Sequence, residues 1–181
     1  SEIETVRREI EKILDDLRRT VKRIEDEVRK IHEDLRRSLE DSKRNIEEIL
    51  KDLERAARRD GLDKKVEDDM RKLVEDLKRK HDKLRADNEA VTKELKDRLK
   101  KLEDDLARAI EELRRRLDKG LDRDHMVLHE YVNAAGITKI KKDLKELLER
   151  YEEIVRRIKE LLKDLNREAE EVVRRLKEEL R

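Results

Sequence analysis

The stretch RDGLD at Arg59–Asp63 is nearly repeated as DKGLD at Asp118–Asp122. Gly61 and Gly120 suit the left-handed residue that ends a helix, because glycine lacks the Cβ that makes this conformation costly. The aspartate that closes each phrase suits the N-cap of the next helix, since its carboxylate accepts hydrogen bonds from unpaired backbone N–H groups. Each phrase therefore predicts a tight turn between two helices.

These two turns divide the chain into three helical segments of nearly equal length, at about residues 2–59, 63–118 and 122–180. Long helices joined by short turns run antiparallel to one another. The expected fold is all-α, a single antiparallel up-down-up three-helix bundle of coiled-coil type that spans residues 1–181.

The composition agrees with long helices that bury a narrow apolar stripe. Charged residues make up 56% of the chain and hydrophobic residues 34%, with no proline, cysteine, tryptophan or phenylalanine. The 51 basic and 50 acidic residues are interleaved and leave a net charge of +1, which argues against nucleic acid or an anionic membrane as partner. The sequence shows no membrane span and no targeting signal, so we expect a soluble chain suited to cytoplasmic expression.

Apolar residues recur at spacings of three and four along each segment, which is the heptad pattern of a coiled coil. The third segment also carries doubled apolar positions, which leave room for a further helix or a second copy. Repeated turns, seams of few residue types and a charged surface resemble those of de novo designed helical bundles. The predicted seams contain Ile3, Val6, Ile10, Ile13, Leu17, Val21, Ile24, Val28, Ile31, Leu35, Leu39, Ile46, Ile49 and Leu53; Leu62, Val66, Met70, Leu73, Leu77, Leu84, Val91, Leu95, Leu99, Leu102, Leu106, Ala109, Leu113 and Leu117; and Ile140, Leu144, Leu147, Tyr151, Ile154, Ile158, Leu161, Leu165, Ala169, Val172, Leu176 and Leu180.

Three polar residues, Ser42, His81 and Asn88, fall inside these seams. A buried polar side chain needs hydrogen bonds, and a satisfied buried network selects one helix pairing over its alternatives. Tight antiparallel turns pair residue i with roughly residue 121 minus i across the first turn and roughly 239 minus i across the second. The pairing predicts two polar layers, one of His32, Asn88 and Tyr151 and one of Ser38, Ser42 and His81.

We expect this network to be structural. No carboxylate or second ligand converges on it, which disfavours a catalytic group or a metal site. No nucleophile with a base and no phosphate-binding loop is present, so we expect neither enzymatic activity nor a cofactor. If His32 or His81 is buried in its neutral form, protonation should loosen the bundle below about pH 6.

Residues Arg123–Thr138, which read RDHMVLHEYVNAAGIT, depart from the heptad pattern of their segment. Glu130 and Asn133 fall into the seam, and the valine, threonine, asparagine and glycine residues weaken a helix. With a period of two instead, apolar residues and Glu130 share one face, as in a β-strand. The segment therefore has two incompatible periodicities, and we expect it to be helical within the closed bundle.

The same sixteen residues resemble the eleventh β-strand of green fluorescent protein, in the solubility-optimised form used as the small fragment of split reporters. The resemblance implies pairing with a ten-stranded fragment, with Glu130 beside the chromophore of the completed barrel. It accounts for His125 and His129 as strand residues, although their spacing also suits a metal pair. The residues implied in partner binding are Arg123, Asp124, His125, Met126, Val127, Leu128, His129, Glu130, Tyr131, Val132, Asn133, Ala134, Ala135, Gly136, Ile137 and Thr138.

These features favour a designed caged reporter or switch. The bundle would hold the strand peptide as helix and release it to complement the ten-stranded fragment, and a designed key helix would raise the open fraction. We expect the closed chain to be a monomer. The alternatives are a passive designed scaffold or heterodimer module with the strand as an embedded tag, and a three-helix partner whose groove accepts a fourth helix.

Overall fold

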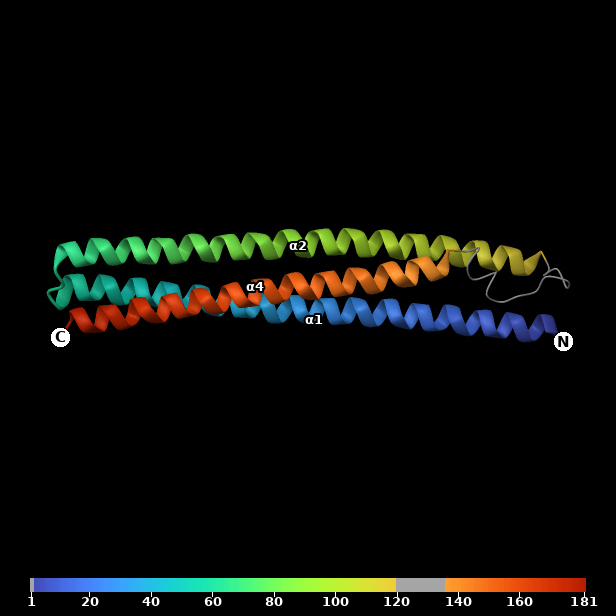
Figure 1. The fold of residues 1–181 in the computed structure, drawn as a ribbon, viewed down its shortest axis with the longest axis horizontal. Helices are drawn as coiled ribbons and strands as arrows, with labels where there is room; N and C mark the ends of the chain where they lie inside the picture. The colour runs from blue at the N-terminus through green and yellow to red at the C-terminus, as the bar shows by residue number, and fades with distance from the viewer. Residues whose placement is uncertain (1, 120–135) are drawn as a thin grey trace. The chain divides into compact units, whose positions relative to one another are not determined.

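The computed structural model describes residues 2–119 and 136–181. These residues form three helices, α1 (Glu2–Arg59), α2 (Lys64–Asp118) and α4 (Ile137–Glu179), of 58, 55 and 43 residues (Figure 1). The described residues include no strand. The predicted fold class, an all-α three-helix bundle, is confirmed.

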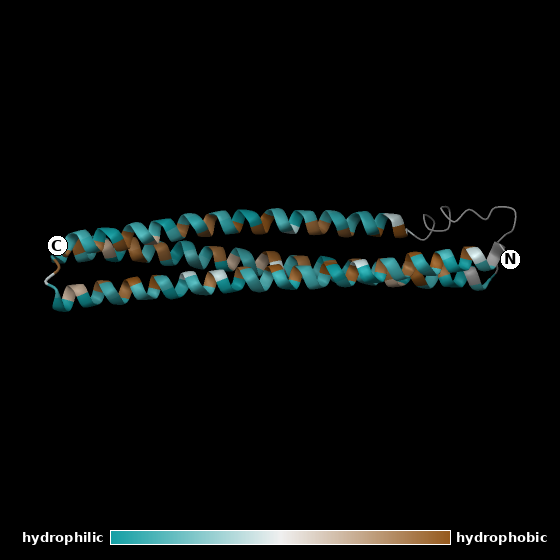
Figure 2. Ribbon diagram, turned by 90° about the horizontal axis from the view of Figure 1, so that it is seen from below, coloured by the Kyte–Doolittle hydropathy of each residue, from teal (hydrophilic) through white to brown (hydrophobic). Residues whose placement is uncertain are grey.

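The helices contribute to two compact units. Unit 1 consists of Ser1–Lys30 and Lys93–Glu152, and unit 2 of Ile31–Thr92 and Glu153–Arg181. Within each unit α2 runs antiparallel to α1 and α4. Each helix carries an apolar stripe on an otherwise hydrophilic surface (Figure 2), and packing of these stripes removes apolar surface from water.

The two cores follow the heptad pattern closely. In unit 1 the buried apolar residues are Ile10, Leu14, Leu17, Ile24, Val28, Leu95, Leu99, Leu106, Ala109, Ile110, Leu113, Ile137, Ile140, Leu144 and Tyr151. In unit 2 they are Leu35, Leu39, Ile46, Ile49, Leu53, Ala56, Met70, Val74, Leu77, Leu84, Val155, Ile158, Leu162, Leu165, Ala169, Val172 and Leu176.

Three predicted seam residues are exposed, namely Leu180, at 40%, and Leu73 and Leu161, each of which lies beside a buried apolar neighbour. Leu73 is 36% exposed while Val74 is 1% exposed, and Leu161 is 52% exposed while Leu162 is 5% exposed. At both places the sequence offers two adjacent apolar residues, and a spacing of either three or four satisfies a heptad. The structure therefore leaves one leucine of each pair near solvent.

The first turn has the predicted chemistry. Gly61 has a φ of 67°, in the left-handed region, and Leu62 N–H donates to the carbonyl of Ala56 at 3.3 Å. The carbonyl of Asp63 accepts the first hydrogen bond of α2, from Glu67 N–H at 2.8 Å. Gly61 is therefore left-handed as predicted and Asp63 directly precedes α2, whereas Gly120 and Asp122 lie outside the described residues.

The start of the third helix differs from the prediction. α4 begins at Ile137, and Gly136 before it has a φ of 73°. A left-handed residue cannot lie inside a right-handed helix, so one uninterrupted helix from about residue 122 to 180 is wrong at Gly136. Of the strand-like segment the structure describes only residues 136–138; residues 123–135, Glu130 among them, lie outside the described residues.

Candidate functional site

The predicted polar residues lie mainly in unit 2, where His81 is buried with 3% of its surface exposed. Its Nε2 atom lies 2.8 Å from the backbone oxygen of Leu39, on α1. Because a carbonyl oxygen only accepts, Nε2 must carry the proton and donate. In the neutral ring Nδ1 then holds the lone pair, 3.7 Å from the carboxylate of Asp82.

Ser42 is buried, but its partner differs from the prediction. Its hydroxyl donates to Oδ1 of Asn166, on α4, at 3.1 Å. Ser38 is exposed and donates to the carbonyl of Asp34 one turn earlier, at 3.1 Å. The inclusion of Ser38 in the buried network is therefore wrong, since its position on α1 faces solvent, and Asn166 is a member that the sequence reading missed.

His32 is half-buried, and Thr92 links it to the main chain of α2. Thr92 donates its hydroxyl hydrogen to the carbonyl of Asn88 at 2.8 Å. Since a hydroxyl has one hydrogen, His32 Nδ1, 3.0 Å from Thr92 Oγ1, must be the donor in the other contact. The heptad pattern assigns the seam position to Val91 and therefore did not predict a role for its neighbour Thr92. The spacing of four residues between Asn88 and Thr92 was the signal that could have indicated their hydrogen bond.

Asn88 is 3% exposed, and its Oδ1 has no hydrogen-bond partner among the described residues. The side chain lines a cavity of about 290 Å³ in unit 2, together with His32, His81 and charged residues of α1 and α2. An unmade hydrogen bond of a buried amide costs about 1–3 kcal/mol. The network is thus incomplete at Asn88.

Tyr151 is buried at 2% exposure but belongs to unit 1, whereas His32 and Asn88 belong to unit 2. Within unit 2 the pairing of α2 with α4 is displaced from the predicted one. A tight turn at Gly120 would set Lys80 level with roughly residue 159, but its ammonium bonds to Glu168. The pairing assumed for this turn is therefore wrong.

The contact of Lys80 with Glu168 joins α2 to α4. Lys80 Nζ lies 2.8 and 3.0 Å from the two carboxylate oxygens of Glu168, and 3.2 Å from Asp76. These hydrogen bonds, first with Glu168 and then with Asp76, raise the pKa of Lys80. Because solvent screens exposed ion pairs, this pair contributes to the choice of helix pairing more than to stability.

Unit 1 contains a carboxyl pair, Glu25 on α1 and Glu103 on α2. A side-chain hydrogen bond with Glu25 raises the pKa of Glu103 from 4.5 to about 7, with further contributions from burial and from the negative charges of Glu25 and Asp104. The shift means that one carboxyl holds its proton near neutral pH. The pair lies beside a groove of about 410 Å³ whose apolar residues include Leu106 and Ile110.

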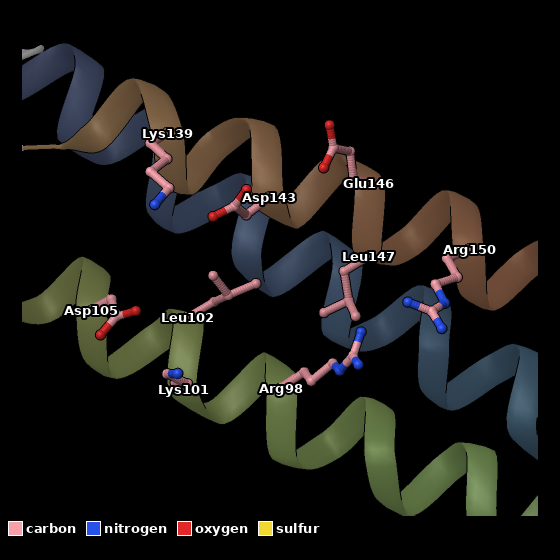
Figure 3. Close-up of a pocket in the computed structure, with 9 residues that line it drawn as sticks. All are labelled: Arg98, Lys101, Leu102, Asp105, Lys139, Asp143, Glu146, Leu147 and Arg150. Atoms are coloured by element: carbon pink, nitrogen blue, oxygen red, sulfur yellow. The ribbon is translucent and has the colours of Figure 1, made fainter.

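A second groove of unit 1 lies between α2 and α4 and has a volume of about 450 Å³. Figure 3 shows Leu102 and Leu147 projecting between the two helices, with charged side chains around them. Both leucines are half-buried. The groove offers apolar contact but no convergent set of catalytic groups.

These sites offer hydrogen bonding, apolar contact and, at Glu103, a carboxyl with a raised pKa. Within residues 2–119 and 136–181 no three histidine, cysteine, aspartate or glutamate side chains are arranged to hold a metal ion. The described helices also include none that is long and apolar enough to cross a membrane.

Comparison with known proteins gives one family. The family model described as apolipophorin-III precursor (apoLp-III) matches residues 2–120, which include all of α1 and α2. No curated protein and no solved structure matches the chain. Because the match spans about two thirds of the sequence, the chain belongs to the apolipophorin-III family.

Proposed function

We propose that this chain is a designed caged reporter, in which residues 123–138 are withheld by the helical bundle and released to complement a ten-stranded fragment of green fluorescent protein. The observation that carries the proposal is the agreement of all sixteen residues with the eleventh strand, inside a chain whose other segments keep a heptad pattern. The family match ends at residue 120, before this segment begins. The proposed role is binding, without catalysis, cofactor or metal.

The C-terminal end of the segment supports caging. Ile137 is the first residue of α4 and is 2% exposed in the core of unit 1. A helix advances about 1.5 Å per residue and a strand about 3.3 Å, so Ile137 cannot stay in α4 and also extend the strand. Full strand pairing therefore requires the first turn of α4 to open.

The next turns of α4 oppose this opening. Ile140 and Leu144 are 8% and 1% exposed, and Ile140 N–H donates to the carbonyl of Gly136 at 3.1 Å. Removing a buried isoleucine or leucine from the core costs about 1.5–3 kcal/mol. The apparent affinity for the ten-stranded fragment falls in proportion to the fraction of molecules that are open. A cost of this size therefore lowers that affinity by roughly tenfold to a hundredfold. A designed key helix that replaces α4 in its contacts would restore it.

The test is fluorescence growth after mixing with the ten-stranded fragment. The reference is free peptide of the same sixteen residues, and caging predicts slower growth with the intact chain. Leu144→Ala leaves the strand sequence intact but weakens α4 in unit 1, so it should accelerate growth. Leu165→Ala is the matched control, since Leu165 is 3% exposed but lies in unit 2.

The result also decides between the proposal and its alternative, a passive scaffold or heterodimer module with an embedded tag. Growth as fast as with free peptide would establish the passive tag. Darkness even after unfolding and refolding together with the fragment would rule out strand complementation altogether. Sedimentation equilibrium of the chain alone tests the expected closed monomer.

A further inference from the structure

A groove of about 570 Å³ lies between α2 and α4 in unit 2. Leu77 and Val172 form part of its floor and are buried at 2% and 6% exposure, whereas Leu73 at its side is 36% exposed. A volume within roughly 300–1,000 Å³ is enough for a small ligand or a few side chains. The groove therefore presents apolar surface that the three helices of the unit leave partly uncovered.

The rim of this groove is acidic. Its charged residues are five carboxylates, from Asp76, Glu168, Glu171, Glu178 and Glu179, and three cations, from Lys80, Arg174 and Arg175. Two of the cations already hold carboxylates, since Lys80 bonds to Glu168 and Asp76 and Arg174 lies 2.6 Å from Glu171. The rim thus has a net charge of −2, because Asp76 and Glu168 exceed Lys80 by one negative charge and Glu178 and Glu179 exceed Arg175 by one.

The position of these two glutamates is unfavourable for the isolated helix. They are the last residues of α4, and its last turn contains one basic residue, Lys177. The C-terminus of a helix carries partial negative charge, so acidic side chains there destabilise the helix. A cation brought to this end of the groove would remove that repulsion.

We propose that the groove of unit 2 is a docking site for a basic amphipathic helix of another polypeptide. Groove-binding helices place apolar anchors at i, i+3 or i+4, and i+7. Here such anchors would contact Leu73, Leu77 and Val172, while flanking lysine or arginine residues would face Glu178 and Glu179. The part of α4 that lines the groove, residues 168–179, corresponds to about three helical turns. This proposal is independent of strand complementation.

The experiment uses labelled synthetic helices and fluorescence anisotropy with the full chain. One peptide has leucine anchors with lysine and arginine flanks, a second has the same anchors with glutamate flanks, and a third has the basic composition with scrambled leucines. The first should bind at least tenfold more tightly than either of the others, with weaker binding at higher salt because the charges are exposed.

Three variants locate the site. Leu73→Glu should weaken binding of the basic peptide at least tenfold, whereas Leu161→Glu should leave it unchanged, because Leu161 is more exposed than Leu73 but does not line the groove. Glu178→Lys combined with Glu179→Lys should reverse the preference between the basic and acidic peptides. Helicity and melting temperature confirm that each variant folds.

Equal binding of the basic and acidic peptides, or binding insensitive to Leu73→Glu, overturns the proposal. A dimer seen in sedimentation equilibrium that Leu73→Glu dissolves also overturns it, since a second copy would then occupy the groove. Neither outcome bears on fluorescence complementation, which Leu73 does not affect under the proposed caging.

Discussion

The Nε2 atom of His81 donates a 2.8 Å hydrogen bond to the backbone oxygen of Leu39, so a buried histidine of α2 is tied to the main chain of α1. The same ring fills space in the core of unit 2. We expect His81→Ala to lower the free energy of unfolding by about 2–4 kcal/mol, because it removes buried volume and the hydrogen bond. Urea denaturation measures the change, and Ser38→Ala, at an exposed position, should alter it by less than about 0.5 kcal/mol.

Equal effects of His81→Ala and Ser38→Ala would contradict the division between a buried His81 and an exposed Ser38. The comparison also separates the two residues that the sequence placed in one polar layer. Heptad spacing correctly predicted that Ser42 and His81 are buried, because neither has an apolar neighbour that could occupy the core position instead. Ser38 was assigned to the polar layer only because it lies at the same height along the bundle as Ser42 and His81. Height along the bundle does not determine which face of a helix a residue occupies.

Asn88 provides the second prediction. Its buried Oδ1 lacks a hydrogen-bond partner among the described residues, and the neighbouring cavity of about 290 Å³ has room for a larger side chain. Asn88→Leu should therefore raise the free energy of unfolding by about 1–3 kcal/mol, because the penalty of the unsatisfied amide disappears. Thermal denaturation should show a higher melting temperature.

Thr92→Val is the matched comparison for Asn88→Leu. Valine has nearly the same shape as threonine but cannot bond to His32 or to the carbonyl of Asn88, so stability should fall by about 1 kcal/mol. If Asn88→Leu destabilised the chain as much as Thr92→Val, Asn88 would have to contribute a favourable interaction that its position in the core does not reveal.

The pairing of α2 with α4 shows what the sequence could not supply. The left-handed glycine of the first turn was predictable because the end of a helix is determined by the residues next to it in sequence. The pairing of Lys80 with Glu168 depends on how far two helices slide past each other. A heptad seam repeats every seven residues, so sliding by about one repeat preserves most apolar contacts, and only specific polar pairs such as Ser42 with Asn166 select the level.

The third prediction concerns pH and the pair of Glu25 and Glu103. Because the pKa of Glu103 rises from 4.5 to about 7 on folding, the folded chain binds a proton that the unfolded chain releases between these values. The contribution to stability is fully present below pH 4.5 and is lost as the pH rises through 7. The melting temperature should therefore be higher at pH 5 than at pH 8, by less than about 4 °C because solvent screens the half-buried pair.

Glu103→Gln isolates this effect, since glutamine is neutral at every pH. The variant should melt above the parent chain at pH 8 and lose the parent's decrease between pH 5 and pH 8. A parent chain that melts lower at pH 5 would indicate that histidine protonation dominates, as the sequence predicted for His32 or His81. If protonation of His81 caused that lower melting temperature at pH 5, His81→Leu would abolish it.

Gly136 gives the last prediction. A Cβ placed on it would meet no atom within 4 Å, so its φ of 73° is the single constraint that favours glycine there. Alanine in the left-handed region costs roughly 1–2 kcal/mol, so Gly136→Ala should lower the melting temperature by several degrees, although alanine usually stabilises a helix start. Asparagine tolerates this conformation better, and Gly136→Asn should fall between the two. An alanine variant that melts at a higher temperature would mean that α4 can extend past residue 136, because continuing the right-handed helix would then be more favourable than the break before Ile137.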